Sequence, residues 1–342
     1  MSGAAGLPLA LTLGEPAGIG PDLALSVWHR RREFGAPVFY VIGDPDFLAA
    51  RARALGIDAV IQRSTATQAA AVFDRALPVV PLADKVTAQP GRPDATSAPA
   101  TIGSIDAAVA DVLAGRAAAV VTNPINKQVL YRAGFTDPGH TEYLGRLAER
   151  ATGKPVMPVM LLWSAELAVV PVTIHVSLKE AIAQLSTRLI VDTGRIVARD
   201  MTARFGIARP RLALAGLNPH AGEDGTLGRE DIEIVAPAVA ALKAEGIDAR
   251  GPLSADTLFH AAARATFDVA LGMYHDQVLV PIKTLAFESG VNVTLGLPFL
   301  RTSPDHGTAF DIAGTGRADP SSLLAALKLA ARLSARAPSP VA

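Results

Sequence analysis

Short apolar runs alternate along this chain with longer alanine- and leucine-rich segments of helical period, and this alternation constrains the fold more than any other feature. Pro8–Leu13, for example, is too short for a core helix, and it leads through a turn rich in glycine and proline into a helical segment. Repetition of that unit predicts an α/β protein with a mostly parallel sheet and helices packed on it. The 342 residues, half of them hydrophobic, are enough for about two domains.

The strands are expected where the apolar runs are bounded by turn residues. These runs are Pro8–Leu13, Val38–Ile42, Val79–Leu82, Ala118–Thr122, Val156–Leu162, Ala168–Thr173, Arg211–Ala215, Val269–Leu271 and Val291–Leu295. Helices are expected between them. Pro21 suits the first position of a helix after Gly20, and Ser177 with Glu180 has the spacing of a capping box. Further helices are predicted over Pro99–Leu113, Thr141–Arg150, Gly228–Ala244 and Ser321–Leu333.

Composition excludes several classes of function. The chain has 32 Lys and Arg residues against 32 Asp and Glu residues, so it lacks the net positive charge typical of proteins that bind nucleic acid or an anionic membrane. It contains no cysteine, which excludes disulfides, thiolate zinc sites, iron–sulfur clusters and a cysteine nucleophile. Any metal must therefore be held by histidines and carboxylates.

The apolar segments do not predict membrane insertion. The most apolar region, Val156–Val176, is interrupted by Ser164, Glu166 and prolines, so none of its uninterrupted apolar runs reaches the length that a spanning helix needs. The first basic residue is Arg30, so the N-terminal segment does not resemble a secretory signal. We therefore expect a cytoplasmic protein.

Three of the seven histidines lie near the ends of predicted strands. His175 follows one apolar run, His220 comes just after a second and His275 after a third. Proteins of the α/β class bind ligands at the carboxyl ends of their strands. Three neutral imidazoles with an open position would suit a catalytic divalent metal, although a histidine at a strand end is more often a hydrogen-bonded structural residue.

The other histidines have different surroundings. His29 lies beside Arg30–Arg32 and is expected on a solvated helix face, whereas His260 lies in an alanine-rich segment and is expected to pack. His140 and His306 lie in loop-like sequences with glycine neighbours, so both remain candidates for a ligand site.

Polar residues interrupt apolar stretches in the last third of the chain. Lys283, Asn292 and Arg301 are spaced at equal intervals. A lysine and an arginine in such settings can neutralise a phosphate, because arginine offers a two-pronged fork and lysine a point charge. The alternative is a surface lysine and a salt-bridged arginine.

Two glycine-rich segments are candidate nucleotide loops. Leu13–Asp22 joins a strand to a helix but does not have the GxGxxG spacing, so it is also compatible with a purely structural turn. Ser303–Arg317 is punctuated by glycines, and its Asp311 could accept hydrogen bonds from ribose hydroxyls. Asp311 has no arginine beside it, which favours NAD over NADP.

Taken together, these segments resemble a known family. The segments are GEPAGIGPD, VTNPINK, GHTEYLG, TIHVSL, GLNPHAGEDG, GMYHDQVLVPIKTL and PFLRTSPDHGTAFDIAGTG, in this order over residues 9–335. They look like the 4-hydroxythreonine-4-phosphate dehydrogenases of pyridoxal phosphate biosynthesis. The first and the last segment also resemble, more distantly, loops of isocitrate and isopropylmalate dehydrogenases, which bind NAD(P) without GxGxxG. After NPHAGE the chain departs from many relatives at Asp224–Leu227, a difference that puts substrate specificity in question.

The resemblance implies a fold of two α/β/α domains, like that of isocitrate and isopropylmalate dehydrogenases, with an active-site cleft between them. Residues 1–130 and 270–342 would form the first domain with the NAD-binding loops. Residues 131–269 would form the second, with metal ligands and dimer contacts. It also implies a homodimer with its active site at the interface.

The resemblance further implies roles for individual residues. His175, His220 and His275 would bind a divalent metal such as Zn, Mg, Co or Mn. The phosphorylated substrate would be bound by His140, Thr141, Lys283, Asn292 and Arg301. NAD, or alternatively NADP, would be contacted by His306, Gly307, Asp311, Ile312 and Gly314. Asp276, which is adjacent to His275, and Asp256 are candidate proton acceptors or orienting groups.

The implied reaction is the NAD-dependent oxidation of 4-phosphooxy-L-threonine, followed by decarboxylation to 3-amino-2-oxopropyl phosphate. A dehydrogenase of threonate or erythronate 4-phosphate is the nearest alternative. A metal-dependent hydrolase is a more distant one, since three histidines and a water also form a hydrolytic site. A non-catalytic nucleotide-binding protein would bind NAD without a metal.

Overall fold

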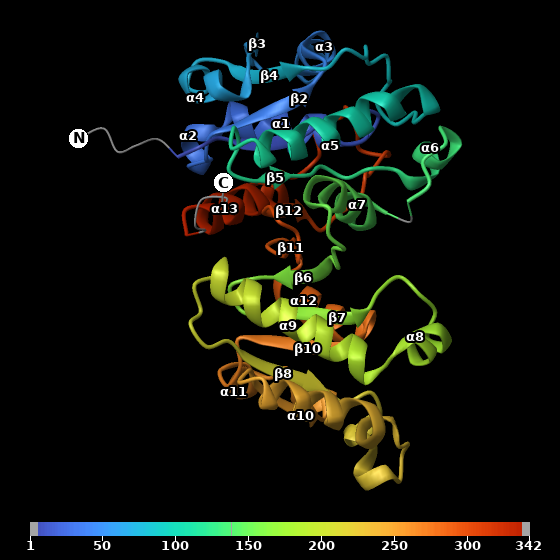
Figure 1. The fold of residues 1–342 in the computed structure, drawn as a ribbon. Coiled ribbons are helices and arrows are strands. Elements are labelled where there is room, and N and C mark those ends of the chain that lie inside the picture. The colour runs from blue at the N-terminus through green and yellow to red at the C-terminus, as the bar shows by residue number, and fades with distance from the viewer. Residues whose placement is uncertain (1–5, 138, 337–342) are drawn as a thin grey trace, which may run out of the picture. The chain divides into compact units, whose positions relative to one another are not determined.

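The computed structural model describes residues 6–137 and 139–336, and it divides into two compact units. Unit 1 comprises residues 1–157 and 297–342, and unit 2 comprises residues 158–296 (Figure 1). Each unit consists of a sheet with helices packed on it, so the predicted α/β class is confirmed.

The sheet of unit 1 is parallel throughout, in the order β3-β4-β2-β1-β5-β12. Its strands are β1 (Leu9–Thr12), β2 (Phe39–Gly43), β3 (Ile61–Arg63), β4 (Leu77–Pro81), β5 (Val120–Val121) and β12 (Arg301–Pro304). The central strands β1 and β2 are buried along their whole length. A parallel strand covered by helices on both faces must be apolar on both, which explains why these strands appear in the sequence as continuous apolar runs.

Helices cover both faces of this sheet. They are α1 (Gly20–His29), α2 (Arg31–Phe34), α3 (Pro45–Leu55), α4 (Ala69–Val72), α5 (Ala98–Leu113), α6 (Lys127–Arg132), α7 (His140–Thr152) and α13 (Ser321–Ser334), with short 3₁₀ turns η1 (Ala66–Gln68) and η2 (Ala95–Ser97). Ala10, Tyr40 and Ile42 point to the face where α5 and α7 pack and form one core cluster. Helix α13 packs on β5 and β12.

The sheet of unit 2 has the order β11-β6-β7-β10-β8-β9. Its strands are β6 (Val159–Trp163), β7 (Ala168–Thr173), β8 (Arg211–Ala215), β9 (Asp248–Leu253), β10 (Val269–Tyr274) and β11 (Val291–Leu295). The pairs β11–β6 and β6–β7 are antiparallel, whereas β7, β10, β8 and β9 run parallel. The carboxyl ends of four neighbouring strands therefore lie at one edge of the sheet.

The helices of unit 2 are α8 (Leu178–Gln184), α9 (Thr187–Ala203), α10 (Ala236–Ala244), α11 (Ala261–Arg264) and α12 (His275–Ala286), with shorter helical segments η3 (Pro219–Gly225), η4 (Asp231–Val235) and η5 (Ala255–Thr257). On one sheet face, α12 places Val278, Leu279 and Ile282 in a core cluster with β6, β7, β8 and β10. Helices α9 and α10 pack together, α9 on β6 and β7 and α10 on β9.

The predicted elements agree best where the sequence is continuously apolar or carries a cap. Strands β7, β8 and β11 have the predicted bounds, and the Ser177 side chain caps α8 by accepting a hydrogen bond from the Glu180 N–H at 3.2 Å. The helix predicted from Gly228 begins only at Asp231, with a π-helical turn. Strands β3, β9 and β12 were not predicted. The last two contain proline, and polar residues make up much of each sequence.

The observed division of the chain differs from the predicted domains, 1–130 with 270–342 and 131–269. Residues 131–157 belong to unit 1 because Tyr143, Leu144 and Ala148 of α7 pack into its core. Residues 270–296 belong to unit 2 because β10 and β11 pair there with its strands. Both terminal parts of the chain contribute to unit 1.

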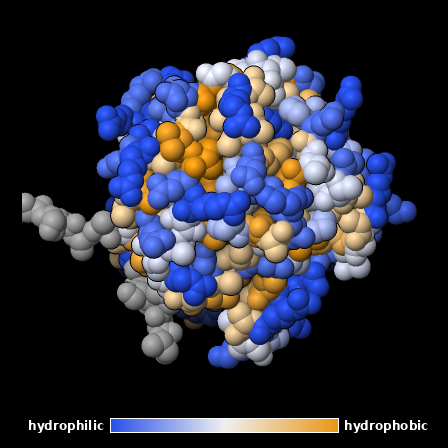
Figure 2. Space-filling model, turned by 90° about the horizontal axis from the view of Figure 1, so that it is seen from above, coloured by the Kyte–Doolittle hydropathy of each residue, from blue (hydrophilic) through white to orange (hydrophobic). Residues whose placement is uncertain are grey.

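No helix in the described part of the chain is both long and apolar enough to cross a membrane. On the face of the molecule shown in Figure 2, hydrophobic side chains occur in small groups between hydrophilic ones.

A buried ion pair joins four segments of unit 1. Arg51 of α3 donates to Asp22 of α1 at 2.5 Å and to the Pro16 carbonyl at 2.7 Å, and the second Asp22 oxygen accepts from the Gly314 N–H at 2.6 Å. Burial raises the pKa of the Asp22 carboxyl, and the positive charge of Arg51 opposes this rise. The pair thus fixes the glycine-rich turn after β1 and the segment around Gly314 relative to α1 and α3.

We predict that Arg51→Met destabilises the protein by about 3–5 kcal/mol, because it leaves the Asp22 carboxylate buried without its cation. Urea unfolding followed by circular dichroism measures the loss. Arg63→Met is the matched control, since Arg63 pairs with Asp46 on the surface and both side chains are more than half exposed. If the two variants unfolded at the same urea concentration, the structural role of Arg51 would be contradicted.

Candidate functional site

The three candidate metal ligands of unit 2 lie at one edge of its sheet. His175 follows β7, His275 follows β10 directly, and His220 lies in η3 after β8. These three strands are neighbours in the order β7-β10-β8 and run parallel. The histidines therefore belong to adjacent loops at the carboxyl edge, where α/β proteins bind ligands.

Two of these imidazoles lie close together. The ring centroids of His175 and His275 are 5.5 Å apart. His220 lies near Asp256, whose pKa is lowered first by a hydrogen bond from the Ser254 hydroxyl and also by the His220 ring. Within the described residues, no three His, Asp or Glu side chains converge closely enough to form a complete metal site. The ligand role of the three histidines stays a prediction.

The backbone at two of the histidines is in the left-handed region. His175 and His220 both have φ of 52°, and Ala221, Glu223 and Asp224 have φ between 45° and 55°. Such a conformation costs a non-glycine residue about 1–2 kcal/mol. Backbone strain of this kind concentrates at ligand sites, where the surrounding structure holds it in place.

Two polar side chains that the sequence analysis did not identify, the half-buried Gln277 and the buried Asp231, hold this edge in shape. Gln277 accepts from the Met273 N–H at 2.7 Å and donates to the Gly216 carbonyl at 2.6 Å, so it links the ends of β10 and β8. Asp231 is fully buried and accepts from the N–H groups of Leu217 and Asn218. No spacing signal indicates either role, because each depends on loops brought together by the sheet.

The two candidate proton acceptors are both exposed. One Asp276 oxygen lies 2.7 Å from Nδ1 of His275, so this carboxylate can orient the ring. Asp256 lies in η5 and accepts from the Ser254 hydroxyl at 2.6 Å.

The predicted phosphate-binding residues are divided between the units. Lys283 on α12 and Asn292 on β11 belong to unit 2 and are half-buried. His140, Thr141 and Arg301 belong to unit 1. The roles of all five residues stay predictions.

Unit 1 has its own candidate ligand-binding position, which is indicated by its strand order. From β1 the chain adds β2, β4 and β3 on one side and β5 and β12 on the other. The strand order therefore reverses between β1 and β5, and in open parallel sheets ligands bind at the carboxyl ends beside such a switch point. The loops there are Leu13–Gly20 after β1 and Thr122–Asn126 after β5.

A buried cationic cluster lies beside this switch point. Arg301, on β12, is 4% exposed, and its Nε and Nη2 donate to the Thr122 hydroxyl at 3.1 and 2.7 Å. Burial lowers the pKa of Arg301 to about 10, so it stays charged at neutral pH. Burial, and then the charges of Arg301 and Lys127, hold the pKa of His140 well below 6.5. His140 is therefore neutral at pH 7.

His140 and Thr141 are the first two residues of α7. Gly139 at the N-cap position provides no side-chain cap for the N–H groups of this helix. The Nε2 atom of His140 is buried and has no hydrogen-bond partner among the described residues. Uncapped N–H groups at a helix start, together with a buried cation, suit an anion.

The predicted cofactor segment, residues 306–316, contains no regular helix or strand. His306 and Ile312 are half-buried, Gly307 and Asp311 are exposed, and Gly314 donates its N–H to Asp22. The Thr308 carbonyl accepts from the Ile19 N–H, and a β-carbon on Gly18 would lie 2.8 Å from that carbonyl oxygen. The two glycine-rich segments identified in the sequence are therefore packed against each other.

Two further polar side chains at the switch point were missed by the sequence analysis. Glu15 is 1% exposed, and one of its oxygens accepts from the Ala17 N–H and the Ser97 hydroxyl. Burial raises the pKa of Glu15. Its other oxygen and Oδ1 of Asn123 are buried without a described partner. Glu15 lies in the turn after β1 and Asn123 just after β5. The sequence does not show that these two loops are neighbours, because that depends on the order of the strands in the sheet.

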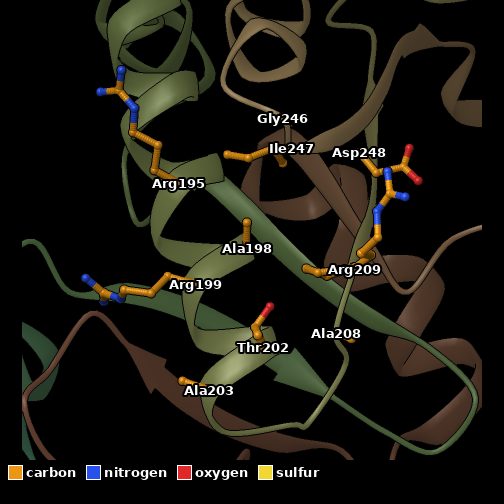
Figure 3. Close-up of a pocket in the computed structure, with 11 residues that line it drawn as sticks. Arg195, Ala198, Arg199, Thr202, Ala203, Ala208, Arg209, Gly246, Ile247 and Asp248 are labelled. Atoms are coloured by element: carbon orange, nitrogen blue, oxygen red, sulfur yellow. The ribbon is translucent and has the colours of Figure 1, made fainter.

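One surface pocket does not belong to either candidate site. It has a volume of about 570 Å³ and lies in unit 2 at the amino ends of β8 and β9, at the edge opposite the histidines. Figure 3 shows Arg195 and Arg199 extending away from Ala198 and Thr202. These arginines pair with Glu245 and Asp200, at 2.6 and 2.8 Å. The pocket is therefore lined largely by small and apolar residues, and the two arginines Arg195 and Arg199 at its rim are paired with carboxylates.

The fold and these sites define a class: an α/β protein of two units, with ligand loops at the carboxyl edges of parallel strands. Comparison with known proteins identifies the family. The family model described as pyridoxal phosphate biosynthetic protein PdxA matches residues 36–330, and the chain belongs to this family. The predicted family membership is confirmed.

Proteins named 4-hydroxythreonine-4-phosphate dehydrogenase are similar over nearly the whole chain. The one from Bradyrhizobium diazoefficiens is 62% identical over 343 residues, which covers 98% of this chain and 99% of its own. The one from Xanthobacter autotrophicus is 62% identical and covers 95% and 93%. The crystal structure of the enzyme from Klebsiella pneumoniae is 36% identical, with a TM-score of 0.84 over 96% of this chain and 99% of that one.

We predict that the protein loses stability as the pH falls from about 7 toward 5, in part through His140. Its pKa is lowered in the folded state, so below pH 6.5 the unfolded chain takes up a proton that the folded chain does not. One such group contributes at most about 1.4 kcal/mol per pH unit. Urea unfolding at pH 7.5, 6.5 and 5.5 measures the slope. His140→Gln should flatten it, whereas His29→Gln, on an exposed residue, should not.

Proposed function

We propose that this chain is an NAD-dependent and divalent-metal-dependent 4-hydroxythreonine-4-phosphate dehydrogenase. It oxidises the secondary hydroxyl of 4-phosphooxy-L-threonine to a ketone, and the resulting β-keto acid loses CO₂ to give 3-amino-2-oxopropyl phosphate. The proposal follows from the family and from relatives with that name that are 62% identical over nearly the whole chain. We place the reaction in the cytoplasm, where NAD is available.

The observation that carries the proposal is the buried, charged Arg301 together with His140 at the start of α7, whose Nε2 atom is buried. A buried arginine that stays charged at neutral pH favours a small anion, and the uncapped N–H groups of α7 favour the same ligand. Binding of a remote phosphate provides energy that positions the reacting carbon. The family's substrate supplies such a phosphate.

We assign the divalent metal to the carboxyl edge of the unit 2 sheet, where the imidazoles of His175 and His275 already lie close together. His175, His220 and His275 would hold it, because imidazole nitrogens are good ligands for Zn, Co and Mn and no thiolate is present in the chain. When bound, such a metal acts as a Lewis acid that polarises a hydroxyl or carbonyl oxygen. The strained backbone at His175 and His220 supports this assignment, since the loops hold both residues in an unfavourable conformation.

NAD fits the switch-point loops of unit 1. It would contact His306, Gly307, Asp311, Ile312 and Gly314, and it would accept the hydride from the substrate carbon. Asp311 is exposed and so accessible to a ribose, and the buried Asp22–Arg51 pair fixes the Gly314 N–H. NADP is less suited, because no arginine adjoins Asp311.

The remaining residues have supporting roles in this proposal. Asp276 orients the His275 ring through its contact with Nδ1. Asp256 lies near His220, and a hydrogen bond from the Ser254 hydroxyl and then the His220 ring lower its pKa, so we assign it the orienting role rather than that of a proton acceptor. Lys283 and Asn292 would bind polar groups of the substrate.

We predict that the purified protein produces NADH, measured at 340 nm, from 4-phosphooxy-L-threonine, and that EDTA abolishes this activity. His220→Ala should lower turnover by a factor of about 100 or more and reduce the bound metal measured by elemental analysis. His29→Ala is the control and should change neither, because His29 is on the surface of unit 1.

The same assay distinguishes the alternatives. Turnover of threonate or erythronate 4-phosphate in preference to 4-phosphooxy-L-threonine would assign a paralogous substrate. Metal-dependent release of phosphate without NADH would indicate a hydrolase. Full activity after complete removal of the metal would contradict the role of the three histidines.

We also propose that the active form is a homodimer with its active site at the interface. Two helices of unit 2 carry exposed apolar side chains at helical spacing: Leu178 and Ile182 on α8, and Val280 on α12 with Phe287 just after it, with exposures from 51% to 76%. Helix α8 begins just after His175, and α12 begins with His275. A second copy that covers these side chains would lie near the histidines.

Val280→Glu combined with Phe287→Glu should convert the dimer to a monomer and lower turnover, because buried carboxylates at an apolar interface are unfavourable. Light scattering after size exclusion measures the mass. Val60→Glu is the matched control, since Val60 is 60% exposed in unit 1. A wild-type protein that is monomeric at micromolar concentration would overturn the dimer.

A further inference from the structure

The environment of Lys127 is unusual for a surface lysine. It is the first residue of α6, in the segment VTNPINK, and its side chain is exposed. Among the residues that the structure describes, none has a carboxylate within ion-pairing distance of its ammonium group. A lysine without a partner is common on a surface, so the role of Lys127 depends on what lies near its Nζ atom.

The Lys127 ammonium lies against the start of α7. A β-carbon placed on Gly139 would be 3.1 Å from Nζ and 3.2 Å from Cε of Lys127. Gly139 has φ of −172°, which any residue adopts, so space and not conformation explains the glycine. The absence of a side chain at this position lets the ammonium group approach the N-terminus of the helix.

The same ammonium is near the buried cationic cluster. Its positive charge contributes, after burial and Arg301, to the lowered pKa of His140. Two permanent cations, Lys127 and Arg301, thus act on one neutral imidazole whose Nε2 is buried without a described partner.

The groups at the start of α7 carry a net positive charge, because the two cations Lys127 and Arg301 outnumber the single carboxylate of Glu142. The amino end of a helix carries a partial positive charge, and a lysine beside it is repelled. Glu142, in the first turn of α7, supplies this carboxylate, and one of its oxygens would lie 2.8 Å from a β-carbon placed on Gly139. An anion with several acceptor oxygens would satisfy the helix N–H groups, the arginine fork and the lysine together.

We propose that Lys127 is a phosphate-binding residue of this site. Its ammonium group, together with Arg301 and the N–H groups at the start of α7, takes the terminal phosphate of the substrate and so sets the preference for a phosphorylated alcohol. The inference rests on the proposed function for the identity of the substrate, but not for the binding of phosphate itself.

The first test is independent of activity. Inorganic phosphate that binds the folded protein raises its melting temperature, and Lys127→Met should abolish that shift at constant ionic strength set with chloride. Lys127→Arg keeps the positive charge and should retain part of the phosphate-induced rise in melting temperature. Lys154→Met, which removes another exposed lysine of unit 1, should leave the shift unchanged. An undiminished phosphate shift in Lys127→Met would overturn the proposal.

The second test is kinetic. Lys127→Met should raise the KM for 4-phosphooxy-L-threonine by about 10- to 100-fold, the range expected for the loss of one charge-assisted contact, and leave the KM for NAD within about twofold. Arg301→Ala should do the same. Equal rises in both KM values would mean that Lys127 supports the fold and does not bind phosphate, which would also overturn the proposal.

The two tests separate the inference from the proposed function. If no substrate yields NADH but the phosphate shift is lost in Lys127→Met, the phosphate site stands and the assigned reaction fails. If NADH is produced and the shift is unaffected, the reaction stands and Lys127 has no part in phosphate binding.

Discussion

The parallel direction of neighbouring strands determines where this chain can bind ligands. In unit 2, β7, β10 and β8 run the same way, so the residues that follow them lie at one edge although they are far apart in sequence. In unit 1 the same rule places the turns after β1 and β5 side by side at a switch point. The histidine edge and the cationic cluster both follow from this constraint, and the side chains add the chemistry.

Hydrogen-bonded polar side chains then fix the loops that the strands bring together. Gln277 bonds the backbone at the ends of β10 and β8, and Asp231 holds the segment before His220. In unit 1 the Asp22–Arg51 pair binds backbone on both sides of the glycine-rich turns. A buried pair of this kind contributes little net stability, because desolvation offsets most of the attraction. The Asp22–Arg51 pair instead fixes the position of the backbone to which it is hydrogen-bonded.

Sequence patterns predicted those features that depend on local order. Continuous apolar runs gave β7, β8 and β11 with the right bounds, and Ser177 marked the start of α8. Strands β9 and β12 were missed because their burial depends on neighbours and not on their own composition. Histidines at strand ends were visible candidates in the sequence. The sequence did not identify Lys127, Glu15 or Gln277 as candidates. The surroundings of each of these side chains depend on segments that are distant in sequence and that only the fold brings together.

The division of the chain has a consequence for its synthesis. Unit 2 is continuous, so all six of its strands have left the ribosome once residue 296 has emerged. Unit 1 has five strands by residue 121, but its sixth, β12, follows the whole of unit 2. Until then β5 presents an unpaired parallel edge, and exposed edges of this kind favour association between nascent chains. Because Arg301 is on β12, the cationic cluster also cannot assemble before the last part of the chain is made.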